Sequence, residues 1–157
     1  MSPNITIRQA GPEDLDTILH HRRSMFHDMG EGTAESLDRM VENTRPWLKR
    51  ALADGSYKAW LAETDERKIA AGGGVLISSW PARPEDPNTR RALVLNVYTE
   101  PEYRRQGLAR EIMLRIIQWL KEDGFRSVFL HASDDGRPLY EKLGFAPTNE
   151  MRLRFDK

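Results

Sequence analysis

The alternation of apolar and polar positions predicts a chain of mixed strands and helices. Residues 4–10 alternate with a period of two, which is typical of a half-buried strand. The runs 57–63 and 69–80 predict two further strands joined by a polar turn. Three consecutive glycines inside the second run indicate a bulge or a close approach of a neighbouring group. Residues 92–99 are apolar on both faces, which indicates a strand covered on both sides.

Four segments carry apolar residues at helical spacing. They are a helix that opens at Pro12, a helix with its stripe from Leu37 to Leu52, a long helix from Leu108 to Asp123 and a short helix at 137–143. The stripe of the long helix comprises Leu108, Ile112, Ile116, Ile117 and Leu120. Gly124 and Gly144 follow the last two helices and are expected to end them.

The order of the later elements predicts a crossover connection. The strand 92–99, the helix 107–123 and a second apolar run at 126–132 form a βαβ unit, which implies one parallel strand pair in an otherwise antiparallel sheet. The terminal residues 151–155 alternate again and predict a last strand. We find no repeat, low-complexity segment or linker, so we expect residues 1–157 to form one domain.

Composition narrows the possible functions. The 157 residues include 24 basic and 24 acidic side chains, so no overall field directs the chain to nucleic acid or to an anionic membrane. The absence of cysteine excludes disulfides, thiolate metal sites and cysteine nucleophiles. The first residues lack an apolar signal core and no run reaches membrane-spanning length. We therefore expect a cytoplasmic enzyme or binding protein.

The stretch YRRQGLAR, residues 103–110, gathers cations at the start of the long helix. A helix start leaves main-chain N–H groups unpaired, and Gly107 adds no side chain that would keep a ligand away from them. Small Ala109 acts in the same way. The stretch therefore indicates a phosphate site, with a solvated helix start as the alternative. It lacks both the Walker A and the dinucleotide-binding pattern.

The segment NVYTEPEYRRQGLAREIM, followed later by LYEKLGF, resembles the GCN5-related N-acetyltransferase (GNAT) family. The resemblance implies an α/β fold with a mixed, mostly antiparallel twisted sheet, a central parallel strand pair and flanking helices. It also implies acetyl-coenzyme A as co-substrate, with its pyrophosphate on main-chain amides of Arg104, Arg105, Gln106, Gly107, Leu108, Ala109 and Arg110. Residues 91–146 would form the cofactor-binding core, and residues 1–90 the acceptor side.

The same resemblance implies that the strand before this loop bulges and splays from its parallel neighbour. The main chain of Val97, Tyr98 and Thr99 would then hold the pantetheine arm and polarise the thioester carbonyl. Thr99 and Ala109 stand where the family often has valine and glycine, but both positions act mainly through the main chain. Ser133 replaces a common asparagine, so its contact with the cofactor stays open.

Tyr140 matches the tyrosine that usually acts as the family's general acid. A phenol with a pKa near 10 keeps its proton at neutral pH and can give it to a departing thiolate. The alternative is that Tyr140 only packs. The general base stays open between water, His131 and Glu100.

The acceptor is expected to enter between the loop after the first helix and the loop 81–90. Asp28 and Trp80 are the candidate contacts, while the further acids Glu31, Glu85 and Asp86 are equally consistent with solvated loops. The histidines at positions 20, 21 and 27 have no convincing spacing for a metal site, and we expect none.

The resemblance thus implies an N-acetyltransferase that moves an acetyl group to the primary amine of a small molecule or protein, by direct attack in a ternary complex. A regulatory acyl-coenzyme A-binding module without turnover is the alternative, and nucleic-acid binding fits poorly with zero net charge. A homodimer is expected from the resemblance and from the strand 151–155, which can meet a partner's sheet edge.

Overall fold

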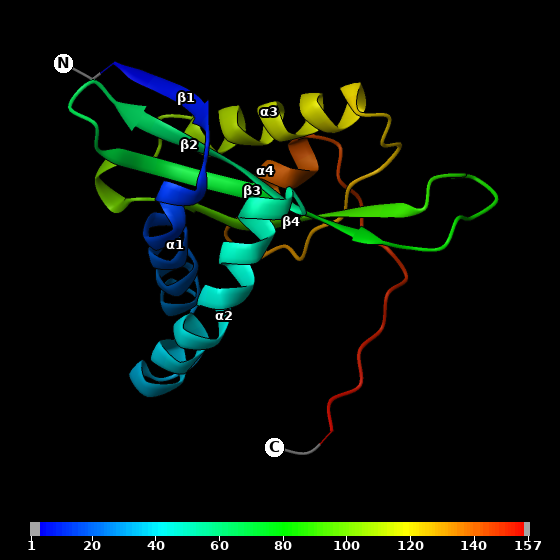
Figure 1. The fold of residues 1–157 in the computed structure, drawn as a ribbon, viewed down its shortest axis with the longest axis horizontal. Helices are drawn as coiled ribbons and strands as arrows, with labels where there is room; N and C mark the ends of the chain where they lie inside the picture. The colour runs from blue at the N-terminus through cyan, green and yellow to red at the C-terminus, as the bar shows by residue number, and fades with distance from the viewer. Residues whose placement is uncertain (1–3, 156–157) are drawn as a thin grey trace.

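The computed structural model describes residues 4–155 and shows one four-stranded sheet between helices (Figure 1). The strands are β1 (Ile5–Gln9), β2 (Tyr57–Thr64), β3 (Ile69–Ser79) and β4 (Arg90–Thr99). The helices are α1 (Leu15–Asp28), α2 (Ala34–Asp54), α3 (Leu108–Glu122) and α4 (Arg137–Lys142), with short 3-10 turns at Pro12–Asp14 and Pro101–Tyr103. The expected α/β class and element order up to α3 are confirmed.

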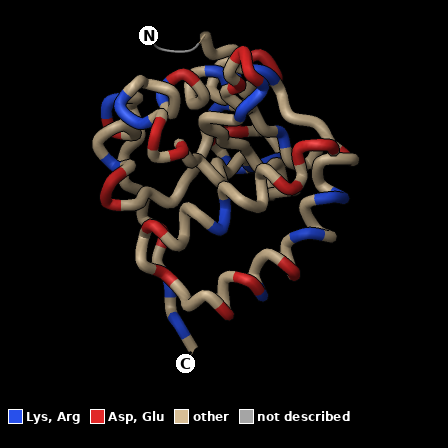
Figure 2. Tube along the Cα trace, turned by 90° about the vertical axis from the view of Figure 1, so that its left-hand side faces the viewer, with Lys and Arg blue, Asp and Glu red and all other residues tan. Residues whose placement is uncertain are grey.

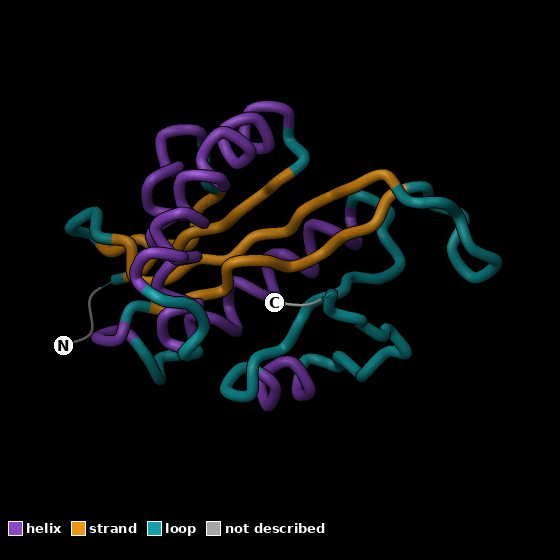
Figure 3. Tube along the Cα trace, turned by 90° about the horizontal axis from the view of Figure 1, so that it is seen from below, coloured by secondary structure: helices purple, strands orange, loops and turns teal. Residues whose placement is uncertain are grey.

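The sheet has the order β1-β2-β3-β4, and every neighbouring pair is antiparallel. Helices α1 and α2 cover one face, and α3 covers the other (Figure 3). The sheet thus lies between two layers of helices, which cover the apolar side chains on both of its faces. β4 is the last strand of the sheet and lies at its edge.

Local signals in the sequence explain the helix ends. Thr33 begins α2 because its hydroxyl accepts a hydrogen bond from the Ser36 amide at 3.1 Å, and Gly55 ends it in the left-handed region at φ 83°. Within the described residues, no helix is long and apolar enough to cross a membrane.

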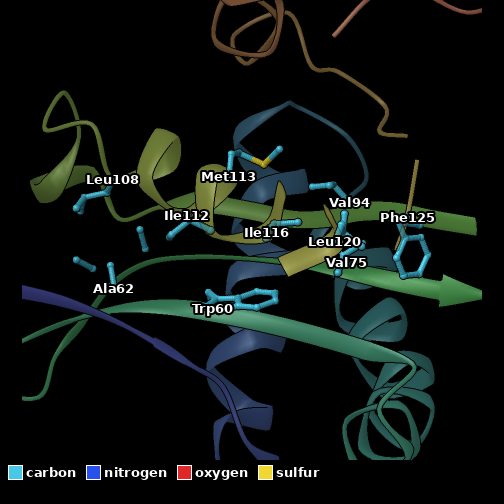
Figure 4. Packing of buried hydrophobic residues seen from close by; sticks show 13 residues of the cluster. Trp60, Ala62, Val75, Val94, Leu108, Ile112, Met113, Ile116, Leu120 and Phe125 are labelled. Atoms are coloured by element: carbon cyan, nitrogen blue, oxygen red, sulfur yellow. The ribbon is translucent and has the colours of Figure 1, made fainter. Parts of the chain in front are cut away.

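Two apolar clusters hold the layers together. The larger one joins α3 to the sheet through buried side chains such as Trp60, Val75 and Ile112 (Figure 4). The smaller one joins α1 and α2 to the opposite face around Leu48 and Tyr57. In α3 the predicted stripe residues Leu108, Ile112, Ile116 and Leu120 are buried, while Met113 is buried in place of Ile117, which is only partly buried.

The predicted parallel partner of β4 is reduced to one bridge. Residues 126–132 contain no strand, but Leu93 and Phe129 form a parallel bridge with two main-chain hydrogen bonds of 2.8 and 2.9 Å. Residues 151–155 likewise form no strand, which differs from the prediction. A strand requires repeated main-chain hydrogen bonds to a neighbour. Within residues 4–155, the first segment makes them to β4 only at Phe129, and the second makes none.

The three glycines in β3 have the consequences that the sequence predicts. The register between β3 and β4 shifts between Gly72 and Gly74, so the pairing is irregular at the glycines, but the extra residue of the bulge lies in β4, because Gly72 pairs with Tyr98 and Gly74 with Leu95. A side chain on Gly72 would lie 2.8 Å from the His21 ring, and one on Gly73 would lie 3.1 Å from Ile112. The glycines therefore let both helix layers approach the same strand.

Candidate active site

The bulge in β4 turns main-chain groups towards the side on which the end of β4 has no paired strand, which we call the gap. Before the bulge, the carbonyl of Ala92 and the amide of Val94 bond to Phe129. The extra residue at Asn96 (φ 62°) reverses this alternation. Because the Glu100 amide bonds back to β3, the main-chain groups of Val97 and Thr99 face away from β3.

The gap begins where the main-chain pairing between β4 and residues 126–132 ends. In the part of the chain that the structure describes, Phe129 makes the only main-chain hydrogen bonds between them. From Val97 onward, β4 therefore has no neighbouring strand on that side. The resemblance implies this splayed arrangement, and the bulge and the single bridge provide it.

Side chains on the α1 face hold the bulge in place. The Arg22 guanidinium donates to the Asn96 side-chain oxygen at 2.8 Å, and the Asn96 amide donates to the Tyr57 hydroxyl at 3.0 Å. Asparagine tolerates the left-handed backbone better than most residues. Burial raises the pKa of Tyr57 to about 12, so its hydroxyl stays neutral.

The loop after β4 presents a row of free amides. Arg105 and Gly107 have positive φ values of 65° and 77°, and Leu108 anchors the start of α3 in the core. The six successive N–H groups from Arg105 to Arg110 make no hydrogen bond to another described residue. A side chain at Gly107 would meet nothing within 4 Å, so no described residue fills the space beside this glycine. Such a concave row of amides binds anions.

The arginines of this loop have different surroundings. Arg104 donates to the Thr99 carbonyl at 2.9 Å and to the Asp28 carboxylate at 2.8 Å, and this pairing lowers the pKa of Asp28. Arg105 and Arg110 are exposed and make no ion pair with any residue in the range 4–155. Arg104 thus ties the loop to β4 and α1, while the other two remain open to a ligand.

Tyr140 lies on α4 with its ring over Gly136 and edge-on to Phe145, at 5.8 Å between ring centroids. Burial raises its pKa above the ordinary value, so it carries a proton at neutral pH. Its hydroxyl makes no hydrogen bond to the described residues and is not enclosed. The group is therefore available as a donor.

Ser133 lies just before α4 and bonds to the main chain at the start of this helix. Its hydroxyl accepts a hydrogen bond from the Gly136 amide at 3.0 Å. A side chain at Gly136 would lie 2.9 Å from the Tyr140 ring, so the glycine makes room for that ring. Ser133 and Gly136 together position Tyr140.

The two candidate bases differ in their surroundings. Glu100 lies 2.9 Å from His20 and 3.9 Å from His21, beside the end of β4. His131 is exposed and lies 3.2 Å from Glu150. His21 is buried beside Gly72, and burial lowers its pKa to about 4, so it is neutral near pH 7.

The structure does not bring Asp28 and Trp80 together. Asp28 lies beside Arg104 at the end of β4, whereas Trp80 stacks on Arg91 at its beginning, 4.5 Å from ring to guanidinium. A ten-residue strand separates these ends by roughly 30 Å. Trp80 is 44% exposed, while the other tryptophans pack against the two clusters.

Sequence reasoning did not identify Arg22, Asn96 and His21 as site residues. A single asparagine in the apolar run ALVLNVYT and a histidine on the apolar face of α1 were the available signals. Among the described residues, no group of three or more histidines and acids could hold a metal. Basic and acidic side chains are interspersed along the chain (Figure 2).

Comparison with known proteins adds independent evidence. The sequence profile of the "Acetyltransferase (GNAT) family" matches residues 17–145. The chain is 34% identical to a crystal structure of a GCN5-related N-acetyltransferase from Ralstonia eutropha JMP134, which it matches with a TM-score of 0.91 over 97% of this chain and 99% of that one. It is 26% identical to a predicted acetyltransferase from Clostridium acetobutylicum solved with acetyl-CoA, with a TM-score of 0.86 over 98% and 96% of the two chains.

A curated relative is similar over a shorter range. Human N-acetyltransferase 8 is 25% identical over 107 residues, which is 65% of this chain. The chain spans less than half of that relative's length, because the match covers 44% of it.

Proposed function

This chain belongs to the acetyltransferase (GNAT) family, and we propose that it transfers an acetyl group from acetyl-coenzyme A to a primary amine. The observation that carries the proposal is the row of six free amides at Arg105–Arg110 beside the gap at the end of β4. Similarity to the Ralstonia protein over nearly the whole chain supports it. The binding of the cofactor and the transfer of protons are argued below from the residues of this chain.

The residues present fit acetyl-coenzyme A. In the proposal, the amides from Arg105 to Arg110 bind its pyrophosphate, and the side chains of Arg105, Gln106 and Arg110 add polar contacts and charge. Leu108 and Ala109 contribute their main-chain amides to this binding, and the small side chain of Ala109 leaves room for the ligand. Arg104 holds the loop in place through Thr99 and Asp28. Ser133 acts through α4, with direct contact to the cofactor as the further possibility.

The chemistry requires a polarised carbonyl, a neutral amine and a proton for the departing thiolate. Acetyl-coenzyme A supplies the thioester. The main-chain groups of Val97, Tyr98 and Thr99 line the end of β4, and those of Val97 and Thr99 face the gap, where an amide can polarise the carbonyl. Tyr140 donates the proton, since its raised pKa keeps the phenol protonated.

The acceptor's proton leaves to water, Glu100 or His131. Glu100 has the stronger geometric support, because it lies just after β4 and against His20. Asp28 is paired with Arg104 and offers no free charge to an ammonium group. Trp80, at the far end of β4, would be reached only by an extended acceptor such as a protein segment. The acceptor class therefore stays a small-molecule or protein amine.

A matched pair of glycine variants tests the cofactor site. Gly107 and Gly124 both have positive φ, and a side chain at either would meet nothing within 4 Å, but only Gly107 belongs to the free-amide loop. We expect Gly107→Val to weaken acetyl-coenzyme A binding at least about tenfold by calorimetry, which is ~1.4 kcal/mol. Gly124→Val should cost similar stability through the same backbone strain, with unchanged affinity.

Equal affinity losses in the two variants would contradict the proposed site. A thiol-release assay on a panel of amines then separates catalysis from the regulatory alternative. Tight binding with no release on any amine would favour the non-catalytic acyl-coenzyme A-binding module.

A further inference from the structure

The side chains of His20 and Glu100 form a hydrogen-bonded pair beside the end of β4. The Nε2 atom of His20 lies 2.9 Å from a carboxylate oxygen of Glu100, although the two residues are 80 positions apart in the chain. A carboxylate only accepts hydrogen bonds, so a neutral ring in this pair carries its proton on Nε2 and a lone pair on Nδ1. The pair therefore fixes which ring nitrogen can accept a proton.

The second nitrogen of the His20 ring is open to a ligand. The side chain is 56% exposed, and Nδ1 makes no hydrogen bond to any residue in the range 4–155. When a carboxylate holds one N–H of an imidazole, it also stabilises the imidazolium ion that forms when the other nitrogen takes a proton. His20 and Glu100 thus have the arrangement of a general base and the group that orients it.

The pair is attached to the part of β4 that faces the gap. Tyr98 stands between Val97 and Thr99, and its ring meets the His20 ring edge-on, at 6.4 Å between the ring centroids. Glu100 directly follows Thr99, and its amide bonds back to β3, which fixes the position of this residue. The base is therefore built onto the same strand end as the main-chain groups proposed to hold the thioester.

Buried His21 places a second imidazole near the same carboxylate. Its Nε2 atom lies 3.9 Å from the Glu100 oxygen that bonds His20, and it is buried without a hydrogen-bond partner. Burial lowers the pKa of His21 to about 4, so this ring stays neutral near pH 7. The carboxylate thus lies near one buried neutral ring and one exposed ring, and only the exposed ring can pass a proton on to water.

A second histidine–glutamate pair lies towards the other end of β4. The Nε2 atom of His131 is 3.2 Å from Glu150, whose carboxylate also lies 3.7 Å from Arg91, near the start of the strand. The main-chain groups that face the gap begin only at Val97, further along β4. Location therefore favours His20 over His131 as the base.

We propose that His20 is the general base of the reaction and that Glu100 orients it. This inference rests on the proposed acetyl transfer and deepens it. As the amine nitrogen bonds to the acetyl carbon, Nδ1 of His20 takes the proton that this nitrogen loses. The carbon–sulfur bond breaks, its electron pair goes to sulfur, and the thiolate takes the proton of Tyr140. The imidazolium then loses its proton to water, and the phenolate regains one from water.

Turnover of a His20 variant is the first measurement. Thiol release is followed with primary amines of different size: benzylamine, spermidine and a lysine-containing peptide. We expect His20→Gln to lower kcat about 10- to 100-fold with little change in the KM for acetyl-coenzyme A, because water replaces only part of a base's contribution. His27→Gln is the matched control and should leave kcat unchanged, since His27 is 71% exposed on the same helix and also lies beside a carboxylate, 3.6 Å from Asp28.

The same assay distinguishes failure of the base from failure of the acetyl transfer. Release that His20→Gln leaves unchanged would remove His20 from the reaction and leave the transfer standing. A fall in kcat with His131→Gln but not with His20→Gln would also refute the proposal. No release from any amine by the wild type would overturn the transfer together with its base.

A double variant tests whether the two side chains act together. Residues that act as a unit have non-additive effects on kcat. The double variant His20→Gln, Glu100→Gln should therefore lose about as much kcat as His20→Gln alone. If Glu100→Gln alone lowers kcat more than His20→Gln does, Glu100 is itself the base and the proposal is wrong.

Chemical rescue shows whether the His20 ring moves a proton or only packs. His20→Ala leaves a space that is open to solvent, which added imidazole can enter. We expect imidazole to restore part of kcat in His20→Ala and to leave kcat of the wild type unchanged, after subtraction of release without enzyme. A loss of kcat that imidazole does not restore would assign His20 a structural role and contradict the proposal.

Discussion

The two sides of β4 use polar groups in opposite ways. On the side of α3 and α4, the six amides of Arg105–Arg110 and the Tyr140 hydroxyl have no partner among the described residues. On the side of α1, the Asn96 side chain bonds to both the Arg22 guanidinium and the Tyr57 hydroxyl, and the unpartnered polar atoms on this side, Arg22 Nε and His21 Nε2, are buried rather than open to a ligand. A polar group without a protein partner is available to a ligand, whereas a bonded buried group stabilises the fold.

This difference assigns different consequences to mutation on the two sides. Side-chain changes on the α3 and α4 side that leave the main-chain conformation intact should alter turnover or binding and leave the free energy of unfolding nearly unchanged. Changes to the buried polar groups on the α1 side should lower the free energy of unfolding first. The predictions that follow test this division.

Replacing Tyr140 with phenylalanine should have the largest effect. General acid catalysis contributes roughly 10²–10⁴-fold, so we expect kcat to fall by at least about 100-fold with little change in the KM for acetyl-coenzyme A. The ring still packs on Gly136, so stability in urea should stay within about 0.5 kcal/mol. An unchanged kcat would remove the acid assignment, and a large loss of stability would break the division between the two sides.

The pH dependence of stability should report His21. Burial lowers its pKa to about 4 in the folded state, while the unfolded value is about 6.5. Between these two values, His21 binds a proton in the unfolded chain but not in the folded chain. The free energy of unfolding therefore falls as pH decreases from about 6.5 to about 4. The total is on the order of 3 kcal/mol.

Urea unfolding of the wild type and His21→Gln across this pH range checks the effect. The variant should lose much less stability between pH 6.5 and 4 than the wild type. His27→Gln is the matched control, because His27 is 71% exposed on the same helix, and this variant should change the slope less than His21→Gln does. Parallel slopes in the wild type and His21→Gln would contradict the prediction.

Replacing Asn96, which also lies on the α1 side, should lower the free energy of unfolding by somewhat less than the protonation of His21. Asn96→Ala leaves Arg22 and the Tyr57 hydroxyl without their partner and forces alanine into the left-handed region. We expect a loss of about 2–3 kcal/mol in urea unfolding. Asn96→Gly removes the same bonds without backbone strain and should lose about 1 kcal/mol less. Equal losses would show that the bulge itself is not strained.

The Asp28–Arg104 pair should have the smallest effect. Both side chains are partly exposed, at 42% and 45%, so the pair is screened by solvent. Asp28→Asn should lower stability by less than about 1 kcal/mol, and 1 M salt should abolish the difference. A larger loss that persists in high salt would contradict this prediction, because it would mean that the exposed pair stabilises the fold as much as the buried bonds of Asn96 do.

Elements with local signals could be predicted from the sequence. The start of α3 follows from Gly107 and the apolar stripe, and the close approach of neighbouring groups to β3 follows from three glycines in one strand. The free amides follow as well, because a helix start leaves them unpaired whatever the rest of the fold does. Features that depend on the main chain of one short segment, such as the free amides at the start of α3, can therefore be predicted from the sequence.

Features that depend on distant partners could not be predicted. Asn96 is 74 residues from Arg22 and 39 from Tyr57, and nothing local in ALVLNVYT indicates which side chains it meets. The apolar run 126–132 has the composition of a strand, but pairing requires a neighbour, and β4 provides it only at Leu93. The separation of Asp28 from Trp80 likewise depends on which end of β4 each one reaches.

The glycine triplet of β3 also limits how this protein can be engineered. Any larger residue at position 72 would displace His21 and Leu61, and one at position 74 would collide with Tyr57. A saturation library over these codons should therefore yield mostly insoluble variants, whereas replacements at Gly30 would meet open space and carry only the strain of its left-handed backbone, at φ 73°. Laboratory evolution of acceptor preference would do best to leave these three codons fixed and diversify the surrounding loops.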